Sequence, residues 1–380
     1  MHIYDYIIIG SGLTGLTIAK KLSQETDNIL VLEAQEITGG GNHPAQINQI
    51  PINNGLRYFP ATEYSAKALT FLEELVGITL ARASVPNTIE TYESSGFKKF
   101  VGFGEKSPEF YEQLSYFLSK EELVLAQEPH LWAQNLAQAL DAQIQKKSIV
   151  TKFGFEGLDS EKPKLTHIIV NGSKTIHGLN FIFAGPVKDL VTLLPDDVLN
   201  IRAKAKLKKA KAWQGVCLDL YHSTVTDKSN LFLLNGTTDD DLGPCVGRFL
   251  PAVAEGEGQI SQWMSFIDSE DAEDTENIGL VLKKMKRQIK RAFPALVDTI
   301  KKERINVTPV LSGTDLKLNA NATLPKVPNL WIASSQVNPY QNLVGSLMQA
   351  QLILSSLGFA TNLEITSVQS QQLPEISEAP

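Results

Sequence analysis

Apolar positions near the start of the chain alternate with glycine and polar residues in a regular order. Residues 4–10 (YDYIIIG) form a nearly continuous apolar run, which predicts a strand buried on both faces of a parallel sheet. Residues 13–22 place apolar side chains at roughly helical spacing, and residues 28–34 (NILVLEA) form a second apolar run. Strand, glycine turn, helix and strand predict a βαβ unit with a right-handed crossover.

The pattern beyond this unit predicts further helices first. Apolar residues recur at helical spacing between Thr62 and Gly77, near residues 108–127 and near 131–145, which predicts helices there. Residues 61–130 are therefore expected to be an inserted, largely helical region.

Short strands are expected next, between residues 149 and 183, with a hairpin turn at Asn171-Gly172. The basic run 202–211 is expected to be a solvated strand or helix face. The acidic run 268–277 is expected to be a loop and a helix N-terminus.

Composition and charge narrow the class of protein. Hydrophobic residues make up 43% and charged residues 20%, as in ordinary globular proteins. The formal net charge of -7 argues against a nucleic-acid partner. The two cysteines, Cys217 and Cys245, form no CxxC pair, and no histidines form an HxxxH pair, so neither a disulfide framework nor a metal site is expected.

The expected location is the cytoplasm. No apolar stretch approaches the roughly 20 residues that cross a bilayer, so no integral membrane segment is expected. The first residues also lack the basic region and cleavage site of a secretory signal.

The glycine turn carries the first chemical signal. Gly10-Ser11-Gly12-Leu13-Thr14-Gly15 is a G-x-G-x-x-G that follows a strand and opens a helix, and Glu33 ends the next strand. In that setting Gly10 permits the tight turn, Gly12 lets a diphosphate approach the backbone, and Gly15 allows close packing. The diphosphate then lies at the helix N-terminus, and Glu33 accepts hydrogen bonds from the adenosine ribose hydroxyls. An acid at this position argues against a 2'-phosphate, so FAD or NAD is favoured over NADP.

A second glycine cluster, Gly39-Gly40-Gly41-Asn42, follows Glu33-Ala34. Such a cluster would let the backbone lie close to the part of a long ligand that extends beyond its adenosine half. A domain that binds only NAD does not need one. Together the two stretches resemble the N-terminus of the FAD-dependent amine oxidase, phytoene desaturase and protoporphyrinogen oxidase superfamily.

This resemblance implies a fold. It is an α/β, glutathione reductase-like flavoprotein with a Rossmann-type FAD-binding domain and an interleaved α+β substrate domain. The FAD-binding domain would comprise residues 1–60, 131–200 and 322–362, and the substrate domain residues 61–130 and 201–321. Residues 363–380 would be a flexible tail.

The resemblance also implies where FAD would lie. Residues 52–60 (INNGLRYFP) look like the strand beside the isoalloxazine ring, and residues 329–350 look like the segment that returns to the flavin. The remaining cofactor residues that it implies are Gly55, Leu56, Arg57, Val150 at the adenine, Ala184, Gly185, Ser334, Ser335, and the amides of Asn342, Leu343 and Val344 at flavin N1 and O2.

Two departures from the family pattern stand out. Ser334 and Ser335 occupy the positions where the family usually carries glycine and an acid that binds the ribityl chain. Gly41 occupies the position of a common arginine. A serine hydroxyl makes a weaker, neutral hydrogen bond to ribityl oxygens, so these departures bear on FAD affinity and on redox activity.

The function implied is hydride transfer from an amine or an unsaturated hydrophobic small molecule to flavin N5. Tyr58, Tyr340 and Arg57 are candidates for the substrate side. Two alternatives stay open: a non-redox flavoprotein similar to UDP-galactopyranose mutase, and a degenerate FAD-fold protein with a binding or assembly role. The sequence leaves open the substrate, the electron acceptor and whether the chain forms a homodimer.

Overall fold

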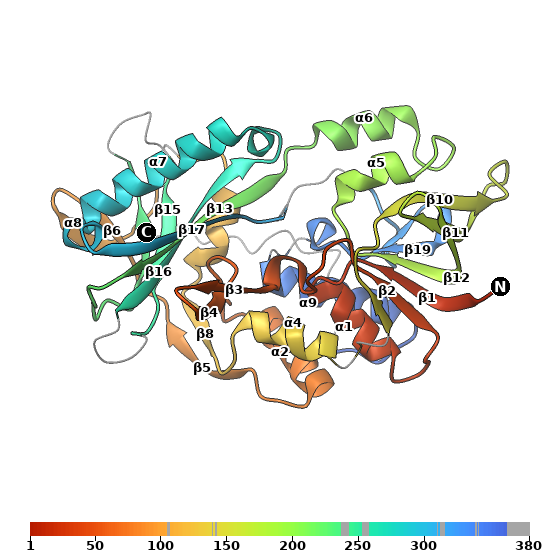
Figure 1. The fold of residues 1–380 in the computed structure, drawn as a ribbon, viewed down its shortest axis with the longest axis horizontal. Helices are drawn as coiled ribbons and strands as arrows, with labels where there is room; N and C mark the ends of the chain where they lie inside the picture. The colour runs from red at the N-terminus through yellow and green to blue at the C-terminus, as the bar shows by residue number, and fades with distance from the viewer. Residues whose placement is uncertain are drawn as a thin grey trace.

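Two β-sheets organise the chain and lie toward opposite ends of an elongated molecule (Figure 1). The computed structural model describes residues 1–104, 107–138, 140, 143–236, 243–252, 258–309, 311, 316–338, 340 and 342–362. The tail predicted at 363–380 lies outside the described residues.

The first sheet has a parallel centre in the order β9-β2-β1-β12-β19. An antiparallel ribbon of β10 and β11 extends it beside β12, and β18 pairs with β19. The strands are β1 (Ile3–Ile9), β2 (Ile29–Leu32), β9 (Ile144–Gln145), β10 (Val150–Glu156), β11 (Lys164–Val170), β12 (Lys174–Phe183), β18 (Thr323–Leu324) and β19 (Val327–Ile332).

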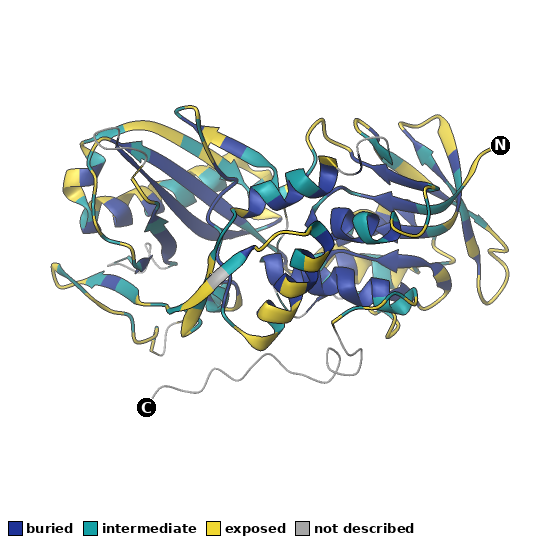
Figure 2. Cartoon of the chain, turned by 90° about the horizontal axis from the view of Figure 1, so that it is seen from below, coloured by how far each residue is buried: buried dark blue, intermediate teal, exposed yellow. Residues whose placement is uncertain are grey.

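Alternating side chains on β1 build a core on each face of this sheet. Ile8 packs on the face covered by four helices, whereas Ile7 and Ile9 pack on the face covered by the β10–β11 ribbon and two shorter helices. The four helices are α1 (Leu13–Leu22), α2 (Glu63–Val76), α4 (Pro129–Gln138) and α9 (Asn342–Ser356), and the shorter two are α5 (Leu190–Leu193) and α6 (Ile201–Lys209). Figure 2 shows the buried strands enclosed by these layers.

The second sheet runs β17-β13-β16-β15-β14-β6-β7 and is antiparallel except where β14 meets β6. Helices α7 (Thr275–Ala292) and α8 (Pro294–Val297) cover one face. The opposite face packs against Leu56, Tyr58 and Phe117. The strands are β6 (Ile89–Glu93), β7 (Gly96–Lys99), β13 (Trp213–His222), β14 (Leu231–Leu234), β15 (Cys245–Phe249), β16 (Gln259–Asp268) and β17 (Ile300–Val307).

Smaller elements connect the two sheets. The antiparallel pairs β3 (Pro44–Ile47) with β4 (Ile50–Asn53), and β5 (Ala81–Pro86) with β8 (Glu121–Leu125), form two short ribbons. Helix α3 (Tyr111–Ser115) precedes β8. No described helix is both long and apolar enough to cross a membrane.

Most predicted elements are confirmed, and one region is wrong. The helices predicted at 13–22 and 62–77, the hairpin at Asn171-Gly172 and the helix after the acidic run are present as α1, α2, the β11–β12 turn and α7. Residues 61–130 are not largely helical, because the described part of that region also contains the four strands β5 to β8. In the described part of residues 131–145, α4 ends at Gln138 and β9 begins at Ile144.

The predicted domain limits stay a prediction. Two helices assigned to the substrate domain, however, pack against the first sheet. Helix α2, assigned to the substrate domain, packs with α1 and α9 on the first sheet. Leu207 of α6 is buried in the core on the other face of the same sheet.

Candidate functional site

The first glycine turn leaves open space at the start of α1. Gly12 is the N-cap residue, no side chain caps the helix there, and a Cβ added to Gly12 would meet no atom within 4 Å. The first backbone N–H groups of a helix have no partner within it, so they are available to a ligand. Gly15 differs, because an added Cβ would lie 2.1 Å from the carbonyl oxygen of Gly10.

The second glycine cluster lies directly against the first. The Gly39 amide donates to the Ser11 carbonyl at 2.9 Å, and an added Cβ on Gly40 would lie 3.1 Å from the Gly12 Cα. Gly39 and Gly40 both have left-handed φ angles, 109° and 55°. The two loops therefore approach each other more closely than side chains would permit.

Glu33 is held in place at the end of β2. Its Oε2 accepts hydrogen bonds from the Ser11 amide at 3.0 Å and the Ser11 hydroxyl at 2.5 Å, and Oε1 accepts from the Gln35 amide at 2.8 Å. A carboxylate offers about four lone-pair positions, so capacity for one more donor remains on Oε1.

The returning segment closes the cavity from the other end of the chain. The Ala333 amide donates to the Phe183 carbonyl at 2.7 Å, which aligns the ends of β19 and β12. The Ser334 hydroxyl accepts from the Gln336 amide at 3.4 Å, and Gln336 Oε1 accepts from the Val187 amide at 2.9 Å. Helix α9 then starts at Asn342, whose φ of 56° is left-handed.

These segments line one cavity of about 630 Å³ at the carboxyl ends of the parallel strands, where open α/β sheets bind ligands. It extends to the face of the second sheet. The predicted site residues in its wall are Gly10, Ser11, Gly12, Leu13, Thr14, Glu33, Ala34, Gly40, Gly41, Asn42, Leu56, Arg57, Tyr58, Val150, Ala184, Gly185, Ser334, Ser335, Asn342 and Leu343.

Five predicted site residues are not among the described residues of that wall. Gly15, Gly39 and Gly55 lie behind it in close contacts with the Gly10 carbonyl, the His43 backbone and the Cys217 side chain. Val344 is buried in the helical core layer, and the Tyr340 ring lies 5.0 Å from that of Tyr64.

Sequence reasoning missed much of the wall. Ser148 and Ile149 precede the predicted Val150, and Asp189, Thr192 and Leu193 follow the predicted Gly185. Burial raises the pKa of the Asp189 carboxyl. At the other end the missed residues are Tyr116, Phe117, Thr308, Pro309 and Leu311. The residues near Val150 and Gly185 could have been predicted only because they lie close in sequence to predicted positions.

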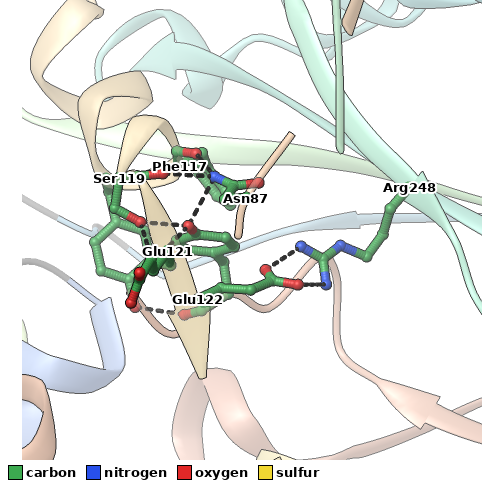
Figure 3. A network of polar contacts seen from close by, with 8 residues as sticks. Asn87, Phe117, Ser119, Glu121, Glu122 and Arg248 are labelled. Atoms are coloured by element: carbon green, nitrogen blue, oxygen red, sulfur yellow. Dashed lines mark hydrogen bonds and ion pairs between the residues drawn. The ribbon is translucent and has the colours of Figure 1, made fainter. Parts of the chain in front are cut away.

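The hydroxyl of Tyr58 is engaged within the protein. It hydrogen-bonds the Ser119 hydroxyl and accepts from Asn87 Nδ2 at 2.8 Å. The guanidinium carbon of Arg248 lies 5.7 Å from the centroid of the Tyr58 ring, and Arg248 forms an ion pair with Glu122 at 2.6 Å (Figure 3). Burial raises the pKa of the Tyr58 phenol. Tyr58 therefore offers the cavity an aromatic wall, not a proton donor.

Tyr116 is fixed in a similar way. Its hydroxyl donates to the Tyr58 carbonyl at 2.5 Å, and burial raises the pKa of its phenol. Both tyrosines are thus neutral wall residues whose polar atoms are satisfied inside the protein.

Among the described residues, no group of three or more metal-ligating side chains could hold a metal ion. The charged side chains in the described wall are Glu33, Arg57 and Asp189. The arrangement suits an elongated ligand with an anionic middle and an apolar end.

Comparison with sequences matches residues 8–75 to a family described as an NAD(P)-binding Rossmann-like domain. A stretch of 39 residues is 46% identical to flavin-containing amine oxidase A of the horse, Equus caballus. That stretch is 10% of this chain and covers 7% of the relative, so the match spans a small part of either protein.

Solved structures resemble the chain over most of its length. An oxidoreductase from Methanosarcina mazei has a TM-score of 0.69 at 13% identity, covering 92% of this chain and 100% of its own. Putrescine oxidase bound to putrescine has a TM-score of 0.61 at 11% identity, and the match covers 93% of this chain and 98% of that one. Cyclohexylamine oxidase from Brevibacterium oxydans has a TM-score of 0.59 at 12% identity, and the match covers 94% of this chain and 100% of that one. These likenesses confirm the predicted α/β fold with a Rossmann-type domain.

Proposed function

We propose that this chain, which shares the fold of these oxidases, binds one FAD in the cavity and acts as an FAD-dependent oxidoreductase on a small molecule. The observation that carries the proposal is the open, uncapped start of α1 at Gly12, placed in one cavity with the start of α9. The amine oxidase match at the sequence level supports the same cofactor class.

The residues present fit FAD. The α1 amides would hold the diphosphate, the remaining lone pair of Glu33 would accept a ribose hydroxyl, and the Val150 backbone would contact adenine. The N-terminus of α9 at Asn342 and Leu343 would stabilise negative charge on the flavin ring. Bound FAD would supply the hydride acceptor.

The substrate end would orient and shield the substrate. Leu56, Tyr58, Phe117 and Leu311 provide apolar and aromatic walls that exclude water. Since the tyrosine hydroxyls are engaged elsewhere, we expect these residues to act by packing and not by moving a proton.

Of the two substrate classes, the wall favours the unsaturated hydrophobic one. The acids in its described part are Glu33, which directly follows β2, and Asp189, which lies in the segment after β12. Both are on the proposed nucleotide side. A protonated amine at the substrate end would therefore lack a carboxylate partner, and burying an unpaired ammonium is unfavourable.

The test is the absorption spectrum of the purified protein, followed by heat release and mass identification of the bound molecule. We expect a flavin spectrum, one FAD per chain, and anaerobic bleaching by an unsaturated hydrophobic substrate. A colourless protein that takes up no FAD would contradict the proposal and favour a binding or assembly role. Activity only after dithionite reduction, without substrate oxidation, would favour a mutase.

A further inference from the structure

Position 41 has room for a side chain. Gly41 lacks the left-handed φ of Gly39 and Gly40, so other residues can adopt its backbone conformation. An added Cβ would meet only ordinary contacts, the nearest being Pro309 Cδ at 3.6 Å and Arg57 Nη2 at 3.8 Å. The guanidinium of Arg57 therefore lies where a side chain from position 41 would extend.

Arg57 is anchored to the second glycine cluster. Its Nε donates to Asn42 Oδ1 at 3.0 Å, Nη2 donates to the Gly41 carbonyl, and Nη1 donates to the Leu56 carbonyl at 3.3 Å. Arginine carries five N–H donors. Two donors, one on each terminal nitrogen, have no partner among the described residues and are available to a ligand.

The charge of Arg57 has no carboxylate partner within ion-pair distance in the described chain. Asp219, the carboxylate whose charge acts on Arg57, is fully buried and pairs with Arg304 at 2.8 Å. Burial lowers the pKa of Arg57, but an arginine stays protonated in proteins. A partly buried cation without a counter-ion is unfavourable, so an anion from outside the chain would stabilise it.

We infer that Arg57 binds the diphosphate of the dinucleotide and supplies the cation that Gly41 does not carry. The location supports the diphosphate, because Gly41 follows Gly40, which contacts Gly12 at the open end of α1. Arg57 also lines the cavity that Gly12 lines. The inference rests on the proposed FAD site.

The experiment measures dissociation constants for FAD and for riboflavin, which lacks phosphate, in cofactor-free protein. Arg57→Gln weakens FAD binding about tenfold to a hundredfold, the effect of losing a charged hydrogen bond, and leaves riboflavin binding unchanged. Gly41→Arg in the Arg57→Gln background restores most of the lost FAD affinity. In the wild-type background, Gly41→Arg weakens FAD binding, because it crowds two like charges.

Arg202→Gln is the matched control, since it makes the same chemical change on the exposed surface of α6 and should leave both constants unchanged. Equal losses of FAD and riboflavin affinity in Arg57→Gln would overturn the inference, as would no loss or no rescue. Wild-type protein that binds riboflavin but not FAD, or neither, would overturn the FAD proposal itself, and the inference with it.

Discussion

Gly12 and Gly15 belong to one glycine motif but have different physical roles. A Cβ at Gly15 would overlap the Gly10 carbonyl at 2.1 Å, whereas a Cβ at Gly12 would project into open space. The fold therefore requires glycine at position 15, whereas at position 12 only the proposed FAD would require it.

Gly12→Val should abolish FAD binding, because its side chain would fill the space proposed for the diphosphate. The melting temperature of the cofactor-free protein should stay within a few degrees of wild type, since a Cβ at position 12 would have no protein atom within 4 Å. Flavin fluorescence titration and thermal denaturation measure the two effects. Wild-type FAD affinity in Gly12→Val would argue strongly against the assigned site.

Gly15→Ala should instead destabilise the protein, by about 1–3 kcal/mol, as overpacking of a buried contact does. Gly279→Ala is the control, because Gly279 is exposed in α7 with open space around it. There alanine should stabilise by up to about 1 kcal/mol. Urea denaturation gives both values, and equal effects of the two substitutions would refute the packing role of Gly15.

At the scale of elements, the end of β13 should make stability depend on pH. His222 is fully buried there, and its Nδ1 contacts the Thr224 carbonyl at 2.6 Å. Burial lowers the pKa of His222 below the value near 6.5 of the unfolded chain. As pH falls below about 6.5, the unfolded chain takes up the proton first, so stability present above that pH is lost.

We therefore expect a lower urea midpoint at pH 5.5 than at pH 8, and a smaller difference in His222→Gln. Burial lowers the pKa of His130 in the same direction, so some dependence should remain in the variant. An unchanged difference between the two pH values in His222→Gln would exclude the contribution of His222.

The elements that sequence patterns predicted are those whose determinants are local. Helix α1 lies between a glycine turn and a polar segment, and Asn171-Gly172 has the left-handed φ angles of a tight hairpin turn. The hairpin of β6 and β7 was missed because its turn is Ser94-Ser95, which adopts left-handed φ angles without the glycine or asparagine that marks such turns. Strand β8 was missed because its partner β5 lies much earlier in the chain. Such pairing leaves no periodic signal within the strand itself.

At the scale of the molecule, FAD should stabilise the folded state by mass action. Binding at 100 times the dissociation constant adds about 2.7 kcal/mol to the free energy of unfolding, because the unfolded chain has no site. The melting temperature should therefore rise with FAD concentration in wild type and stay constant in Gly12→Val. A constant wild-type value would contradict FAD binding.

The half of the candidate site that we propose for the nucleotide was predictable from the sequence, and the half that we propose for the substrate was not. Glycine turns and Glu33 reveal themselves through residue type and spacing, since the backbone itself forms the contacts. Tyr116, Thr308 and Leu311 reach the cavity only because the second sheet packs across it. Likewise, the hydrogen bond from Arg57 to the Gly41 carbonyl joins residues from different segments, so the spacing of residues in the sequence does not predict it.

The joining of β19 to β12 has a consequence for biosynthesis. The start of α1 is made early, but the opposite wall belongs to residues 333–336, 342, 343 and 346, which emerge from the ribosome hundreds of residues later. A growing chain can thus offer the nucleotide only an incomplete groove. Capture of the cofactor should be one of the last steps of maturation, after translation has passed α9.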